Sequence, residues 1–338
     1  MAPGSPLHRP GAQIAGSDGR NRRRRIVQFL LDNGLFIAFA LELILFAVAA
    51  PDLFIRSRTM EAILRLSGPA GIVLASYTIT LISGQIDLST AQVGGMASLM
   101  FAAVFQLLEW PLGIALALTV VLTIAVGLLS SYLIQQGIPS FVSTLAVGVV
   151  CGGIGFLIID LTDQPGMIRL VRPPLRDIAN FEIIGVPFVI PMMFVAYAIG
   201  WVVLNQTRFG AHIYAMGGNP AAAALNGINA IRIARIVLVV NAVITGMAGI
   251  LIAGRQLAAQ PGVEGLGQSL TAALFAGVAL SGGSGKIERT LIGLLFLSTL
   301  TIGLGILNVA APVRQLIFGS AFVFAILLDS IRQQLASR

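Results

Sequence analysis

The sequence predicts an all-α membrane protein, a polytopic bundle of about ten transmembrane helices. Two observations favour this fold class. The 338 residues are 57% hydrophobic and only 10% charged, with a mean hydropathy of +0.92, whereas an ordinary soluble domain carries about 25% charged residues. The apolar residues also form continuous runs of the length that a spanning helix needs, roughly 17 to 25 residues, and not the alternating pattern of a membrane β-barrel.

Ten apolar runs are expected to cross the membrane as helices. The predicted spans are residues 27–50, 67–83, 89–108, 111–134, 138–160, 185–204, 234–256, 268–281, 290–308 and 312–329. One transmembrane domain, 27–330, therefore fills most of the chain. It lies between a basic tail at 1–26, expected to be disordered, and a short tail at 331–338. Ten crossings return the chain to its starting side, so both tails are expected to be cytoplasmic.

The formal net charge of +7 comes mainly from arginine, and its distribution indicates the orientation of the chain. Arg20 and Arg22–Arg25 form the densest basic cluster, directly before the first span. Such a cluster favours a cytoplasmic N-terminus. Binding to nucleic acid or anionic lipid is the alternative interpretation of a basic tail, but the position beside a span favours a topology signal, and no nucleic-acid partner is expected.

Many of the 38 glycines lie inside the predicted spans and not in loops. They include Gly94, Gly95, Gly152, Gly153, Gly155, Gly246, Gly249, Gly303 and Gly305. Lipid supplies no hydrophobic force between helices, so small residues that let backbones approach closely hold such bundles together. These glycines are therefore expected at helix contacts.

The sequence offers no catalytic or metal-binding set. Cys151 is the single cysteine, and His8 and His212 stand far apart, so metal chemistry is not expected. The segment LSGGSGK (280–286) does not match a phosphate-binding loop, because Leu280 takes the place of the first glycine and Ile287 follows the lysine. We expect a protein that is not an enzyme and that binds no cofactor itself.

A short water-facing helix is predicted within YAMGGNPAAAALNGIN (214–229). Asn219 is a good N-cap and Pro220 suits the first helical position, while Asn226-Gly227 provides a stop. Because isolated helices shorter than about 12 to 15 residues are marginal in water, this one is expected to be ordered by docking. A helical loop without a partner is the alternative. The segment is flanked by Arg208, Arg232 and Arg235.

Four stretches resemble the ribose-type permease subunits of bacterial ATP-binding-cassette (ABC) importers, and the resemblance covers about residues 60–330. The stretches are SGQIDLS (83–89), IPSFVSTLAVGVVCGG (138–153), TRFGAHIYAMGGNPAAAALNGIN (207–229) and LSGGSGK (280–286). Gln85 stands where this family usually has glycine, Val278-Ala279 where it tends to have small polar residues, and Lys286, Glu288 and Arg289 add charge.

The resemblance implies a transport role for a multi-pass protein of the bacterial inner membrane. The short helix would be a coupling helix that fits a cleft in a cytoplasmic ATPase subunit, and its carried-over residues are Gly218, Asn219, Pro220, Ala222, Ala223, Gly227 and Ile228, beside Arg208. The implied partners are a second permease chain in a homo- or heterodimer, two ATPases that hold ATP and Mg, an external solute-binding protein, and a small sugar such as ribose or a related polyol.

Polar residues inside the apolar runs are candidates for the translocation pathway and its gate. Asp87 and Ser89, at the start of the third span, can cap a helix or help to set a gate. Asn241 and Thr245 share one face of the seventh span and could contact a neutral sugar or bond to a neighbouring helix. Gln256, at the outer end of that span, is a weaker pathway candidate.

Two further sets of charged residues are candidates for a functional role. Glu42 lies deep within the first span and is by default a functional candidate, although satisfaction by a neighbouring helix is favoured over proton carriage. In the external segment 160–182, Arg169, Arg172 and Arg176 are candidates for docking the binding protein through acids on its surface. A solvated connector is the alternative for that segment.

Two other transport functions remain open at the level of sequence. One is a branched-chain amino-acid permease of the same superfamily. The other is a proton-coupled secondary transporter, which would need no ATPase and would use Glu42 or Asp87 as a titrating group. A membrane-embedded enzyme is disfavoured, because no catalytic set is present.

Overall fold

The computed structural model describes residues 33–173, 177, 179–263 and 268–336, so the basic N-terminal tail and Arg176 lie outside the described residues. An apolar helix at Asn33–Ala49 opens the described chain. It is followed by α2 Pro51–Phe54, α3 Ser57–Ile82, α4 Thr90–Ala102, a π-helical turn at Ala103–Leu107, α5 Leu112–Gln135, α6 Ser140–Leu161, α8 Val189–Gln206, α9 Arg208–Gly218, α10 Pro220–Leu225, α11 Ala230–Gln256, α12 Ser269–Phe275, α13 Ile287–Ile306 and α14 Ala311–Ala336.

Sheet structure is minimal in the described chain. Strand β1 (Ile168–Arg169) pairs antiparallel with β4 (Ala258–Ala259), and β2 (Glu182–Ile183) forms a hairpin with β3 (Val186–Pro187). Among the described residues, eight helices are long and apolar enough to cross a membrane, namely α3, α4 with its π-helical turn, α5, α6, α8, α11, α13 and α14. The predicted all-α membrane bundle is therefore confirmed.

Three predicted boundaries differ from the structure. Helix α3 begins at Ser57, ten residues before the expected start at 67, because its first turns carry charged residues that a hydropathy criterion excludes. The span expected at 268–281 is helical only over the seven residues of α12. Helix α14 continues to Ala336, so residues 331–336 extend the last helix.

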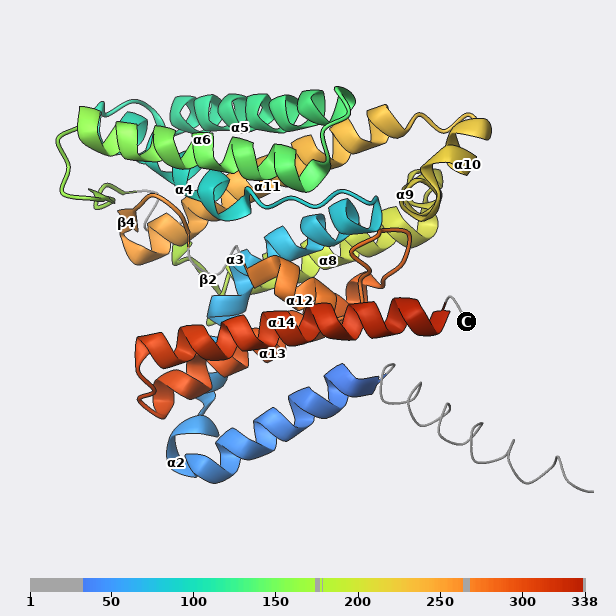
Figure 1. Ribbon diagram of the computed structural model, residues 1–338. Helices are drawn as coiled ribbons and strands as arrows, with labels where there is room; N and C mark the ends of the chain where they lie inside the picture. The colour runs from blue at the N-terminus through green and yellow to red at the C-terminus, as the bar shows by residue number, and fades with distance from the viewer. Residues whose placement is uncertain (1–32, 174–176, 178, 264–267, 337–338) are drawn as a thin grey trace, which may run out of the picture.

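The long helices run side by side, with two distinct ends (Figure 1). Helix α11 packs against α5 and α4, and α3 lies between α8, α13 and α11. At one end lie α10 and the C-terminal end of α14; we call this the α10 end. At the other lie β4 and α2; we call this the β4 end (Figure 1).

Close backbone contact holds the centre of the bundle together. Gly249 of α11 faces α4, where a Cβ added to it would overlap the carbonyl oxygen of Gly94 and lie 2.8 Å from that residue's Cα. On α4, a Cβ at Gly95 would overlap the backbone of Gly262. Glycine is therefore required where α4 and α11 cross, as predicted for Gly249. The prediction is wrong for Gly153, where nothing lies within 4 Å of an added Cβ.

Substitution at this crossing gives a direct test of the packing. Gly249→Ala is expected to lower the free energy of unfolding by about 1 to 3 kcal/mol, because two backbones must separate to admit one methyl group. Thermal unfolding in detergent measures the change. Gly153→Ala on α6 is the control, since nothing lies within 4 Å of its added Cβ. Equal melting temperatures for the two variants would contradict this account of the crossing.

Candidate functional site

The short helix predicted from its capping residues is present at the α10 end. Helix α10 begins after Asn219, whose Oδ1 accepts a hydrogen bond from the Ala222 N–H at 3.0 Å. Pro220 occupies the first helical position. After the helix, Gly227 adopts a φ of 76°, which a residue without a Cβ accommodates readily. Arg208 is the first residue of α9, which leads into this segment.

The two faces of α10 differ in exposure. Ala223 is buried and Ile228 is partly buried against the core, whereas Ala221, Ala222 and Ala224 are exposed. Leu225 is 90% exposed at the C-terminal end of the helix. The sequence analysis did not single out this residue. A large apolar side chain at the end of a run of alanines in a water-facing helix does, however, indicate a contact with another protein.

Two glycine-containing turns meet the last turn of α9. Gly84 follows α3, Gly217 lies in the last turn of α9, and Gly283 lies in the non-helical segment 276–286 between α12 and α13. The Gly283 N–H donates to the Ile82 carbonyl at 2.8 Å, and a Cβ at Gly217 would overlap that same oxygen. We call the contact of these turns the glycine junction.

The glycine junction joins α9 to two non-helical segments. Residues 85–89 connect α3 to α4 as a drawn-out coil (Figure 1), and we call them the extended segment. Residues 276–286 are non-helical after α12 ends. Inside a membrane such backbone must find protein partners. The Ile86 and Leu88 N–H groups donate to the hydroxyls of Ser140 and Thr144, at 3.1 and 3.0 Å. A displacement of α9 would therefore press directly on backbone that is not stiffened by helical hydrogen bonds.

The extended segment also carries a buried carboxylate that reaches across to α11. Asp87 Oδ1 accepts hydrogen bonds from the Ser89 N–H at 2.9 Å and from its hydroxyl at 2.5 Å, while Oδ2 accepts from Asn241 Nδ2 at 2.9 Å. Asp87 is 5% exposed and Asn241 0%. The N-cap residue Ser89 makes no side-chain capping hydrogen bond, and Asp87 links the start of α4 to Asn241 of α11.

Thr245 lies one turn beyond Asn241 on α11, as their spacing predicted, and it is also buried. Within the described chain, neither the Thr245 hydroxyl nor Asn241 Oδ1 has a hydrogen-bond partner. Two polar atoms therefore remain unpaired beside the Asp87–Asn241 link. In this conformation they are enclosed by protein.

Gln256 lies far from that cluster, at the β4 end of α11, where it lines a cavity of about 480 Å³. Two of the predicted docking arginines, Arg169 and Arg172, lie at the same end, and Arg176 lies outside the described residues. Arg169 is exposed in β1, but Arg172 donates to the Phe105 carbonyl at 2.6 Å and stacks over the Phe105 ring at 4.7 Å. Arg172 is thus engaged in holding the loop against the end of α4.

Glu42 is 7% exposed within the first described helix. The expected partner from a neighbouring helix is not found among the described residues, where neither carboxylate oxygen accepts a hydrogen bond. In the described part of the bundle, this acid is therefore buried and has none of the relay partners that proton transport would need.

A bundle of helices long enough to span a membrane, with a short capped helix between α9 and α11, fits a membrane transport protein. Residues 59–327 match the family model described as branched-chain amino acid transport system / permease component. The chain belongs to this family of ABC transporter permeases. It is a transport subunit and not an enzyme, and permeases of this kind work with separate ATPase subunits and with binding proteins.

Individual relatives cover nearly the whole chain. The ribose import permease protein RbsC of Haemophilus influenzae is 28% identical over 309 residues, which is 90% of this chain and 95% of that protein. The L-arabinose ABC transporter permease protein AraH of Azospirillum brasilense is 28% identical over 342 residues, covering 98% and 96%. The xylose transport system permease protein XylH of Haemophilus influenzae is 25% identical, covering 88% and 95%. No solved structure matches the chain.

The link between the extended segment and α11 can be measured with a double-mutant cycle. Asn241→Ala leaves Asp87 Oδ2 without its donor, so Asp87→Ala and Asn241→Ala should show a coupling free energy of about 1 to 3 kcal/mol in unfolding experiments in detergent. Thr245→Val, which removes a hydroxyl that has no partner, should not destabilise the protein. Additive effects of the two alanine substitutions would contradict the link.

Proposed function

We propose that this chain is the membrane-spanning permease subunit of a bacterial ABC importer for a monosaccharide, ribose or a related pentose or polyol. The observation that carries the proposal is full-length similarity to ribose, arabinose and xylose permeases. The branched-chain amino-acid alternative shares the family description, but the relatives described above are sugar permeases and do not favour it.

The proposed assembly pairs two permease chains with two ATPase subunits and an external binding protein. The α10 end faces the cytoplasm of a bacterial cell and the β4 end faces outward. Support for this orientation comes from the exposed arginines around α10, Arg208, Arg232 and Arg235, together with the basic N-terminal tail, because positive residues favour the cytoplasmic side. ATP and Mg are held by the ATPases.

The proposed coupling element is the segment from α9 to α10. Its exposed surface comprises Arg208, Gly218, Asn219, Pro220, Ala222 and Gly227, with Leu225 as an apolar anchor. Ala223 and Ile228 face the bundle and seat the helix. Closure of the ATPases would move this segment, and the glycine junction would pass the displacement to residues 85–89 and 276–286.

In this mechanism the Asp87–Asn241 link acts as part of the gate. Ser89 holds the Asp87 carboxylate in place, and Thr245 and Asn241 Oδ1 offer unpaired polar atoms to a passing hydroxyl. Gln256 belongs to the outer part of the pathway. Arg169 and Arg172, with Arg176, lie in the segment proposed to receive the binding protein. ATP can shift the gate only through contacts that differ between the two states.

Uptake in whole cells tests the proposed function. Cells that express the complete transporter are expected to accumulate radiolabelled ribose, arabinose or xylose, and an ATPase subunit inactivated in its nucleotide site should abolish the accumulation. Accumulation of leucine and of none of these sugars would contradict the sugar assignment. Uptake driven by a proton gradient without the ATPases would exclude an ABC mechanism.

The coupling role is tested at Ala222, whose side chain is exposed and is not packed in the core of the bundle. Ala222→Trp should leave expression unchanged but reduce uptake at least tenfold, because the added ring obstructs docking of the ATPase. Leu157→Trp, on the exposed face of α6, is the control for the bulk of tryptophan. Wild-type uptake and ATP hydrolysis in the Ala222→Trp transporter would overturn the role of α10.

A further inference from the structure

A cavity of about 480 Å³ with a mixed polar and apolar lining lies within the chain at the β4 end. It is formed where α3, α11, α12 and α13 come together, and its polar lining includes Arg65, Arg255, Gln256, Ser269, Ser298 and Thr301. Its volume falls in the range of small-molecule sites, about 300 to 1,000 Å³. The cavity lies at the opposite end of α3 from the glycine junction, so it is distinct from the coupling region.

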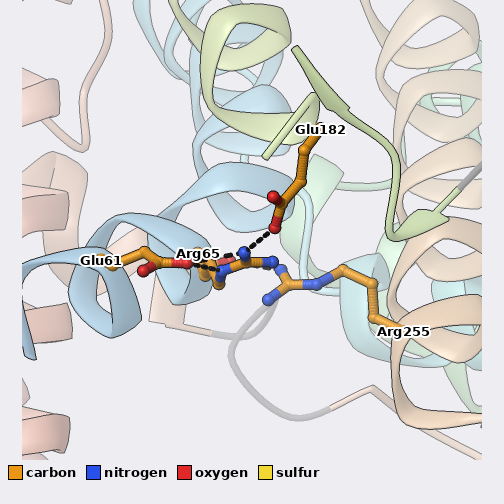
Figure 2. A network of polar contacts seen from close by, with 4 residues as sticks. All are labelled: Glu61, Arg65, Glu182 and Arg255. Carbon is orange, nitrogen blue, oxygen red and sulfur yellow. Dashed lines mark hydrogen bonds and ion pairs between the residues drawn. The ribbon is translucent and has the colours of Figure 1, made fainter. Parts of the chain in front are cut away.

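Charged side chains border this cavity in a balanced network (Figure 2). Arg65 donates through Nε to Glu61 Oε1 at 2.6 Å and forms an ion pair with Glu182 of the β2–β3 hairpin. Arg255 donates to the backbone carbonyl of Arg65. The two guanidinium groups line the cavity, and the carboxylates of Glu61 and Glu182 pair with Arg65 from outside its lining. The four side chains together carry no net formal charge, so the network favours a neutral ligand over an anion.

Ser269 gives an independent indication that the cavity holds a ligand. It lines the cavity at the start of α12 and is 3% exposed, and its hydroxyl has no hydrogen-bond partner among the described residues. A buried polar group without a hydrogen-bond partner lowers the free energy of unfolding by about 1 to 3 kcal/mol. A ligand that enters the cavity from outside would supply the partner that the Ser269 hydroxyl lacks.

We propose that this cavity is an outer subsite for a neutral polyhydroxy solute inside each permease chain. The Ser269 hydroxyl is a donor and acceptor for the solute, Gln256 offers an amide, and the guanidinium of Arg255 offers further donors. The Arg65–Glu182 ion pair ties the β2–β3 hairpin to α3 beside the cavity, which fixes one wall. This subsite rests on the proposed sugar import, because it is the position in the chain where the imported solute would bind.

Thiol protection tests the subsite in cells that express the complete transporter. In a Cys151→Ala background, Thr301→Cys places one thiol in the cavity and Ser57→Cys places one at the exposed start of the same α3 that carries Arg65. A membrane-impermeant methanethiosulfonate reagent is added outside. D-ribose is expected to slow the labelling of Thr301→Cys at least threefold and to leave the labelling of Ser57→Cys unchanged.

A second variant connects this protection to the unpaired hydroxyl. Ser269→Ala, combined with Thr301→Cys, should raise the ribose concentration for half-protection about three- to tenfold, as the loss of one hydrogen bond predicts. Ser67→Ala is the matched control, because that buried hydroxyl donates to Ile63 within α3 and does not line the cavity. It should leave protection unchanged.

The outcomes separate the two proposals. No labelling of Thr301→Cys from outside, or labelling that ribose does not slow in cells that still accumulate ribose, would overturn the subsite and leave sugar import standing. Protection that is equally lost in Ser67→Ala would overturn the role of Ser269. Accumulation of L-leucine but of neither ribose, arabinose nor xylose would overturn the proposed function and the sugar subsite with it.

Discussion

Direct backbone contact at the glycine junction is the constraint on which the rest of the structure depends. The turns at Gly84 and Gly283 approach the last turn of α9 so closely that a Cβ at Gly217 would overlap the Ile82 carbonyl oxygen. Side chains usually absorb small movements between packed elements by changing rotamer. Here no side chain intervenes, so the end of α9 and the two non-helical segments have to move together or separate.

Under the proposed mechanism, the ATPases act at the α10 end and the solute binds at the β4 end. Helix α3 carries Arg65 beside the cavity and ends at Ile82 in the glycine junction, and α11 runs from the segment after α10 to Gln256 in the cavity wall. These two helices pack on each other. Between the ends, the Asp87–Asn241 bond ties the extended segment to α11, so the proposed movement at the junction has a physical route to the proposed subsite.

Local chemistry explains what could be predicted from the sequence. Continuous hydropathy identified the membrane bundle, and the cap at Asn219 with the stop at Gly227 identified α10, because both signals are contained in a few neighbouring residues. The early start of α3 was missed because Arg58 and Glu61 lower its hydropathy. The shortness of α12 was missed because segment 276–281 is apolar whether it is helical or not.

Contacts between distant segments could not be read from the chain in the same way. Asp87 and Asn241 are 154 residues apart, and each was a candidate with no indication that the other was its partner. The cavity beside Ser269 exists only because four helices meet there. The glycines of LSGGSGK suggest a phosphate-binding loop in the sequence, but in the structure they allow the backbone to approach α9 closely.

The most direct test of the account is a pair of cryo-EM maps of the assembled importer, one without nucleotide and one with ATP trapped in the ATPases. The account predicts α10 seated in an ATPase cleft in both maps, with Gly217, residues 83–89 and residues 280–285 displaced together between them. An α10 that is free in solvent would contradict it, and so would an α10 that moves while residues 83–89 and 280–285 stay fixed.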